Sequence, residues 1–220
     1  MHRYPSRFFA RTVFAAAFLA HGILAGAAGD ALAAGGTDPD WPCIQVKVPT
    51  LSLGMMWGGP IPDDGDTLWK DDPEIRRLAR QLAIRRTPLD QAADLIESYA
   101  AKLDPSLRDR SLAGLMVAVL RDINRERDRV MAGITRFTRK QQKLADAVRE
   151  TRTQLSDVLA IAAPSETEDA KRRELEDALL WQTRIHDDRE HTLKFVCESP
   201  VLLEQRAFEL AREIANHLSQ

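Results

Sequence analysis

A long heptad repeat is the feature that most constrains the fold of this chain. Between residues 116 and 158, mostly apolar residues recur every seven positions, and a second series follows each of them by four positions. Such a repeat places one apolar seam along a helix. The seam residues are Met116, Leu120, Ile123, Val130, Ile134, Phe137, Leu144, Val148 and Leu155. A helix of about 55 residues would run roughly 80 Å, and it must bury this seam against a partner.

The expected partner is the next helical segment of the same chain. Residues 164–169 interrupt the helical pattern, and a poorer apolar stripe follows over about 167–197. A short break forces an antiparallel return, in which position i lies opposite roughly 327 − i. Residues 136–143 should then face 184–191. The first stretch is basic and the second is rich in acidic residues, so we expect ion pairs across the seam.

Polar residues directly before proline mark the other helix starts. Asp72-Pro73, Thr87-Pro88, Asp104-Pro105 and Ser199-Pro200 each place a side-chain oxygen where the first backbone N–H groups need an acceptor. These signals and the break predict helices at about 73–86, 88–103, 105–161, 167–197 and 200–218. The predicted fold class is all-α: a helical domain over 71–220, built as a bundle with a long antiparallel coiled-coil hairpin.

Residues 34–70 form a segment of a different kind, rich in proline and glycine. Two short alternating stretches, IQVKV and TLSL, can be extended but are too short for a sheet of their own. Three tryptophans argue against a disordered linker, because disordered segments contain few aromatic residues. We therefore expect an extended arm that packs on the helical body, with Trp41, Trp57 and Trp69 as its anchors.

The first 33 residues have the pattern of a secretory signal peptide. Arg3, Arg7 and Arg11 precede and flank an apolar run over 12–28, and small residues follow at 31–33. We expect cleavage after Ala33, with residue 27 as a second site. The alternative is a retained anchor, although the run is short for a membrane span. Cleavage leaves no stable span and predicts an exported, periplasmic protein of a Gram-negative bacterium.

The charge of the mature chain argues against a nucleic-acid partner. Cleavage removes three arginines and one aspartate, which leaves 28 basic residues against 32 acidic ones, a net charge of about −4. Nucleic-acid-binding domains are usually basic.

Cys43 and Cys197 are the only cysteines. Neither has the small-residue context of a lipid-attachment site or the spacing of a redox or zinc motif. In an oxidising compartment a structural disulfide is the expected use of such a pair. It would fasten the arm to the bundle.

No catalytic constellation, cofactor motif or metal site is expected. The most metal-like cluster is HDDREH at 186–191, where His186 and Glu190 share a helix face, as do Asp187 and His191. Pairing with Arg136, Arg139 and Lys140 across the hairpin explains these residues without a metal.

The sequence therefore favours a non-catalytic scaffold or adaptor of the cell envelope. Its hairpin would bind a protein partner or a second copy of the chain. The alternative is a ligand- or metal-binding bundle, or an accessory subunit of a periplasmic enzyme, with Met55, Met56 and Trp57 lining a pocket between arm and helices.

Overall fold

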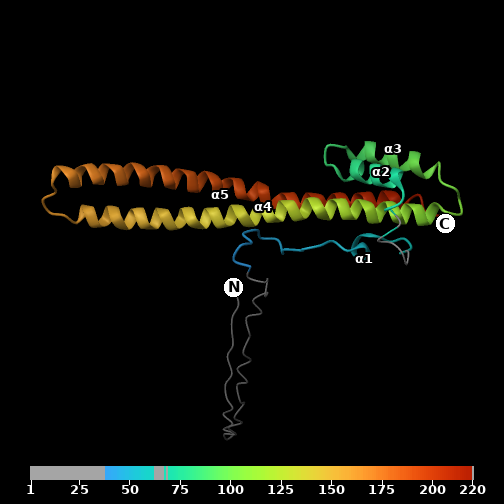
Figure 1. Ribbon diagram of the computed structural model, residues 1–220, viewed down its shortest axis with the longest axis horizontal. Coiled ribbons are helices and arrows are strands. Elements are labelled where there is room, and N and C mark those ends of the chain that lie inside the picture. Colours follow the sequence, from blue (N-terminus) through green and yellow to red (C-terminus); the bar gives the residue numbers. More distant parts are fainter. Residues whose placement is uncertain (1–37, 62–66, 68, 220) are drawn as a thin grey trace, which may run out of the picture. The chain divides into compact units, whose positions relative to one another are not determined.

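Figure 1 shows the computed structural model of the chain, which describes residues 38–61, 67 and 69–219. These residues belong to one compact unit, 35–220. They form helices and contain no strand, which confirms the all-α prediction. The helices are α1 (Leu53–Met56), α2 (Pro73–Ala83), α3 (Leu89–Ala100), α4 (Arg108–Leu159) and α5 (Glu166–Ala215). The expected signal peptide, residues 1–33, lies outside the described residues.

Helices α4 and α5 form the expected antiparallel hairpin and lie side by side along their length (Figure 1). At the end that also holds α2 and α3, the seam is closed: Met116, Ile123 and Ile134 are 0 % exposed. Toward the tip of the hairpin, Leu144 and Leu155 are only partly buried. Two helices alone cover the seam there, so its residues keep some contact with water.

Two polar contacts fix the register of the hairpin. The side-chain amide of Gln141 donates to the carbonyl oxygen of His186 at 2.7 Å. The hydroxyl of Thr151 donates to the side-chain oxygen of Gln182 at 3.0 Å. Gln141 and His186 are the positions that the expected pairing of i with 327 − i places opposite each other.

The turn between the two helices is closed by a capping box. The Ser165 hydroxyl accepts from the backbone N–H of Glu168, and the Glu168 carboxylate accepts from the backbone N–H of Ser165. This reciprocal pair satisfies two N–H groups at the start of α5. Hydrogen bonding with the backbone of Ser165, and secondly with its side chain, lowers the pKa of Glu168.

Helices α2 and α3 pack on one end of the hairpin and complete a four-helix head. The amphipathic patterns of the sequence produce this arrangement, since each short helix buries one apolar face and leaves a charged face outside. The largest fully buried apolar side chains of the head are Leu51, Leu82, Ile96, Leu112, Leu115, Met116, Ile123, Leu203, Leu210 and Ile214. In the described part of the chain, no helix has both the length and the apolar character needed to cross a membrane.

The break expected at Ser199-Pro200 is wrong, because α5 continues through it to Ala215. A proline inside a helix removes one backbone hydrogen bond and costs about 3 kcal/mol. Here Pro200 is buried, and the segment after it carries Leu203, Leu210 and Ile214 into the head core. Burial of these side chains outweighs the local cost.

Other helix ends differ from expectation by a few residues. Asp72 does cap α2, since its carboxylate accepts from the N–H groups of Glu74 at 2.8 Å and Ile75 at 3.1 Å. Asp104 instead accepts from the backbone and hydroxyl of Ser106, and α4 begins only at Arg108. The hydroxyl of Thr87 donates back to the carbonyl oxygen of Gln81, so α3 begins at Leu89 without a side-chain cap.

Candidate functional site: the stapled arm and the hairpin

The described arm, residues 38–61, runs along the α4–α5 pair on the side away from α2 and α3 (Figure 1). It is extended, apart from the single turn α1. It makes no ladder with another strand, so its backbone groups depend on side chains of the helices for hydrogen bonds. Three helix side chains supply such bonds, those of Asn124, Arg127 and Gln142.

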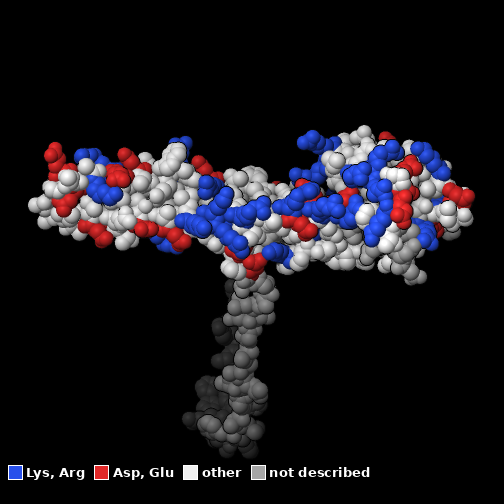
Figure 2. Space-filling model, viewed as in Figure 1, with Lys and Arg blue, Asp and Glu red and all other residues white. Residues whose placement is uncertain are grey.

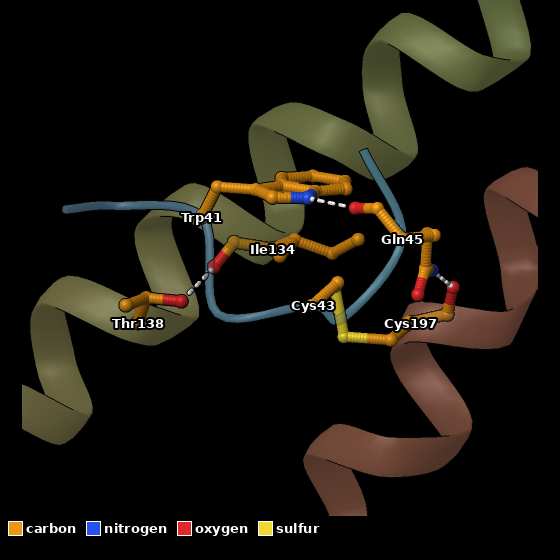
Figure 3. Close-up of a disulfide and its surroundings, with 6 residues drawn as sticks. All are labelled: Trp41, Cys43, Gln45, Ile134, Thr138 and Cys197. Atoms are coloured by element: carbon orange, nitrogen blue, oxygen red, sulfur yellow. Dashed lines mark hydrogen bonds between the residues drawn. A yellow bond between two sulfur atoms is a disulfide. The ribbon is translucent and has the colours of Figure 1, made fainter. Parts of the chain in front are cut away.

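A disulfide joins Cys43 of the arm to Cys197 of α5, with the two Cα atoms 5.6 Å apart (Figure 3). This agrees with the pairing expected from the sequence. The side-chain amide of Gln45 donates to the carbonyl oxygen of Cys197, and the indole N–H of Trp41 donates to the carbonyl oxygen of Gln45 at 2.8 Å. The residues around Cys43 therefore form a small, cross-bonded loop over the seam.

Two polar side chains of α4 hold the next part of the arm. The Asn124 amide accepts from the backbone N–H of Leu51 at 2.9 Å and donates to its carbonyl oxygen at 2.8 Å. Arg127 donates to the carbonyl oxygen of Val48 at 3.0 Å. Arg127 occupies a seam position of the heptad repeat that is usually apolar, and here it binds the arm.

Arg127 is an incompletely satisfied buried cation. The residue is only 2 % exposed, and its Nε and Nη1 groups have no hydrogen-bond partner among the described residues. Burial lowers the pKa of Arg127, and the nearby carboxylates of Glu204 and Asp128 partly offset this effect.

Ion pairs fasten the start of the described arm nearer the tip of the hairpin. The Arg139 guanidinium binds the Asp40 carboxylate at 2.5 and 2.8 Å, and the Gln142 amide donates to the carbonyl oxygen of Pro39 at 3.0 Å. Within the arm, Lys47 binds Asp38 at 2.7 Å. The hydrogen bond from Lys47 is the main reason that the pKa of Asp38 is lowered.

All three predicted tryptophan anchors contact the body or the arm itself. Trp57 is 6 % exposed and belongs to the head core, and its indole N–H donates to the carbonyl oxygen of Pro60 at 2.9 Å. Trp69 packs against the core, with the Arg121 guanidinium 3.6 Å above its ring. Trp41 closes the loop at Gln45. A Cβ at Gly59 would lie 2.6 Å from the Trp57 ring, so glycine permits this close turn.

The alternation of IQVKV does not match the burial of the arm. Val48 packs against the core as expected, but Val46 is 72 % exposed and Ile44 is fully exposed. The arm bends at residues 44 and 45 so that Cys43 and Gln45 both reach Cys197. The bend interrupts the two-residue period that the pattern assumes.

The ion pairs expected across the seam are not those that form. In the described parts of the chain, the ion pairs join near neighbours of one helix, two residues of the arm, or Arg139 to the arm. Side chains that project from the outer faces of two packed helices are closer to the next turn of their own helix than to the opposite helix. Polar contacts at Gln141 and Thr151 cross the seam instead.

The metal-like cluster remains an exposed group on α5. Ligand atoms of His186, Asp187 and Glu190 lie within 4.8 Å of one another, and the two carboxylate residues are exposed. His191 turns its Nδ1 toward the backbone oxygen of Asp187 at 2.8 Å. Exposed acidic groups are common without a metal, so this geometry alone does not assign one.

A groove does lie between the arm and α5, with a volume of about 510 Å³, but its arm side is formed by residues 42–45 and not by the three residues predicted to line it. Met56 and Trp57 are both 6 % exposed core residues, whereas Met55 is 54 % exposed on the surface. Met56 and Trp57 belong to the head core, and none of the three lines this groove.

An unpredicted groove lies between the end of α2 and the first half of α4. It has a volume of about 730 Å³ and is lined by Arg80, Ala83, Ile84, Arg85, Arg86, Asp122, Arg125, Glu126, Arg129 and Leu203. We call it the arginine groove. Its five arginines come from segments about 40 residues apart in the chain, so only the fold reveals that they converge.

The rim of the arginine groove is held by a buried cation of α5. The Arg206 guanidinium donates to the carbonyl oxygens of Leu82 at 2.7 Å and Thr87 at 2.9 Å, on either side of the turn that carries Arg85 and Arg86. Burial lowers the pKa of Arg206. These bonds hold the turn, and with it the backbone of Arg85 and Arg86.

No protein-family model, no curated protein sequence and no solved structure matches this chain.

Proposed function

We propose that this chain is an exported, non-catalytic protein of the cell envelope whose hairpin binds a protein partner, as a scaffold or adaptor does. The observation that carries the proposal is the exposed distal half of the hairpin. Beyond Gln142, α4 and α5 pack only on each other among the described residues, far from the head (Figure 1). Among residues 145–180, only Thr151 and Leu175 are buried.

The distal half of the hairpin does not serve the stability of the head. The head core consists of residues from 51–123 and 203–214, and the arm contacts end at Gln142. A pair of helices with no core beyond its seam costs conformational entropy to order, and a surface for binding explains why the chain carries it. Exposed apolar side chains on this half include Leu159, Leu180 and Trp181.

Export is part of the proposal, and the disulfide supports it. A disulfide such as Cys43–Cys197 persists in secreted and periplasmic proteins and is rare in reducing compartments. The signal-peptide pattern of the first 33 residues is the second support. The bond fastens the arm to α5 between the head and the exposed half of the hairpin.

The test is a shortened hairpin. Residues 145–180 are removed, and Leu144 is joined to Trp181 by a short glycine-serine loop. Because nearly all buried residues are kept, the shortened protein should fold with its disulfide intact. Tagged wild type, crosslinked in its own cell envelope, should capture a defined protein partner that the shortened protein does not capture.

The matched control replaces both cysteines with serine and keeps the hairpin. This variant should be less stable but should still capture the partner. If the shortened protein captures the same partner as the wild type, the hairpin is not the binding element and the proposal is wrong.

A further inference from the structure

One outer stripe of α4 has a charge pattern that is complementary to itself. Residues at intervals of seven are Arg129, Arg136, Lys143, Glu150 and Asp157, and all five are exposed. A spacing of seven keeps them on one face of the helix. We call this the charge stripe. It is basic toward the head and acidic toward the tip of the hairpin.

Most of the charge stripe is not neutralised within the chain. Arg129 pairs with Glu126. Arg136, Lys143, Glu150 and Asp157 take part in none of the ion pairs found among the described residues. In the space-filling view, Lys and Arg gather over the middle of the hairpin and on the head, and the tip end carries Asp and Glu together with some Lys and Arg (Figure 2).

The tip of the hairpin has the chemistry that fits the arginine groove. Residues 157–169 contain four acidic residues and no basic residue. Leu159 is 59 % exposed and Ile161 is 37 % exposed. The arginine groove offers five guanidinium groups against two carboxylates, and an exposed apolar side chain in Ile84 (52 % exposed). Arginine binds carboxylates with two parallel hydrogen bonds, and its groups here are set on a fixed rim.

The three groove arginines on α2 and its following turn are available for such a contact. Arg80, Arg85 and Arg86 form no ion pair with the described residues. In contrast, Arg125 pairs with Asp122, and Arg129 pairs with Glu126. Asp122 is already bonded to Arg121 as well. An acidic segment entering the groove would therefore meet uncompensated positive charge.

We propose that two copies of this chain bind side by side in antiparallel orientation, with the tip of each hairpin in the arginine groove of the other. A twofold axis beside Lys143 places Arg129 against Asp157 of the partner subunit. It also places Arg136 against Glu150 of the partner subunit. Because the interface is isologous, each of these pairs occurs twice. The proposal rests on the proposed function, since it names the partner of the hairpin as a second copy.

The dimensions of the molecule suit this arrangement. From Arg125 to Leu159 the helix advances about 51 Å at 1.5 Å per residue, and a helix is about 10 Å wide. A strip of this size approaches the surface of about 800 Å² per partner that a stable interface buries, and two tip-in-groove contacts add to it. The net charge of −2 disfavours a membrane surface or a nucleic acid as the occupant, since either would meet the acidic remainder of the chain.

Exposed ion pairs contribute little each, so the dimer should be weak and sensitive to salt. Sedimentation equilibrium of the disulfide-bonded exported protein should show a monomer–dimer equilibrium. Its dissociation constant should rise about tenfold or more between about 50 mM and 500 mM sodium chloride. A wild-type protein that stays monomeric at low salt and high concentration overturns the proposal.

Two reversed variants test the geometry. Arg129→Glu with Arg136→Glu makes the stripe acidic throughout, apart from Lys143. Glu150→Arg with Asp157→Arg makes it basic throughout. Each variant alone should be monomeric, because like charges then face each other. An equimolar mixture should form a heterodimer, because the four pairs that involve positions 129, 136, 150 and 157 are again opposite in charge, and Lys143 faces its own copy in every combination.

The control is Arg189→Glu with Lys194→Glu, which changes the charge of the exposed face of α5 by the same amount. It should dimerise like the wild type. A dimer that survives both stripe reversals, or a mixture that stays monomeric, overturns the proposal. This outcome is distinct from failure of the proposed function, because a monomeric protein can still be tested for capture of a different partner with the shortened hairpin.

Discussion

The side chain of Asn124 binds both backbone polar groups of Leu51, 73 positions away in the sequence, at 2.9 Å from the N–H and 2.8 Å to the carbonyl oxygen. Leu51 is 1 % exposed, so these groups cannot reach water. The carboxamide of Asn124 takes the place that a neighbouring strand would have in a sheet. The arm is therefore packed on the helices as part of the fold, with the disulfide as a second attachment.

Replacement of Asn124 by alanine should lower the free energy of unfolding by about 2 kcal/mol. It leaves a buried N–H and a buried carbonyl without partners, and such groups cost about 1–3 kcal/mol. Urea unfolding followed by circular dichroism measures the change. Gln142→Ala is the matched control, since the Gln142 bond to Pro39 is exposed and its loss should change stability far less. Equal effects of the two variants would contradict this account of the arm.

Loss of the Cys43–Cys197 bond should lower the free energy of unfolding by about 2–5 kcal/mol, because the bond closes a long loop in the unfolded chain. The comparison is between the wild type and the variant with both cysteines replaced by serine. Hydrogen exchange should show faster opening of residues 39–48 in the variant, with the head helices still protected. A variant that melts like the wild type would show that the bond adds nothing to the fold.

The two buried arginines should respond differently to replacement by methionine. Arg206 has two bonds to backbone oxygens that join α5 to the turn after α2, so Arg206→Met should destabilise by about 1–3 kcal/mol. Arg127 is buried with two nitrogen groups unpaired, so Arg127→Met removes a desolvated charge and should change stability by less than about 1 kcal/mol, or raise it. Thermal unfolding of both variants measures the difference. A larger loss of stability for Arg127→Met than for Arg206→Met would contradict this account of the two arginines.

Tyr99 should make the protein less stable at high pH. Its hydroxyl is buried with only the Ser111 side chain as a polar neighbour among the described residues, and burial together with the carboxylates of Asp72 and Glu74 raises its pKa. The group stays neutral in the folded state. Above pH 10.0, its ordinary pKa, the unfolded chain loses the proton first, so stability falls as pH rises. The hydrogen bond from Ser111 offsets only part of this shift.

The measurement is urea unfolding between pH 8 and 11 for the wild type and Tyr99→Phe. The two should be similar below about pH 9, and the variant should lose less stability above it. The lysines titrate in both proteins and cancel in the comparison. Parallel curves of stability against pH across the whole range would show that the pKa of Tyr99 is not raised in the folded protein.

The hairpin could be predicted from the sequence because its information is local. The heptad spacing identified the seam residues, and the break near Pro164 predicted the antiparallel return. The pairing of Gln141 with His186 then followed from the length of each helix. Such periodic patterns persist over many turns, so one irregular position does not change the result.

The features that were predicted wrongly or not at all depend on contacts between distant segments. Pro200 stays inside α5 because the residues after it pack into the head, which no local rule on proline can include. The polar seam position Arg127 binds Val48 of the arm, and the arginine groove joins α2 to α4. The path of the arm itself had to be known before these contacts could be foreseen.

The most direct measurement of the central claim is photo-crosslinking in living cells. A photoreactive amino acid is placed at Gln154, exposed on the distal hairpin, or at Gln91, exposed on α3 of the head. The account predicts a crosslinked protein from position 154, of dimer mass if the partner is a second copy, and no such product from position 91. Crosslinking from position 91 with none from position 154 would contradict the claim that the hairpin is the binding element.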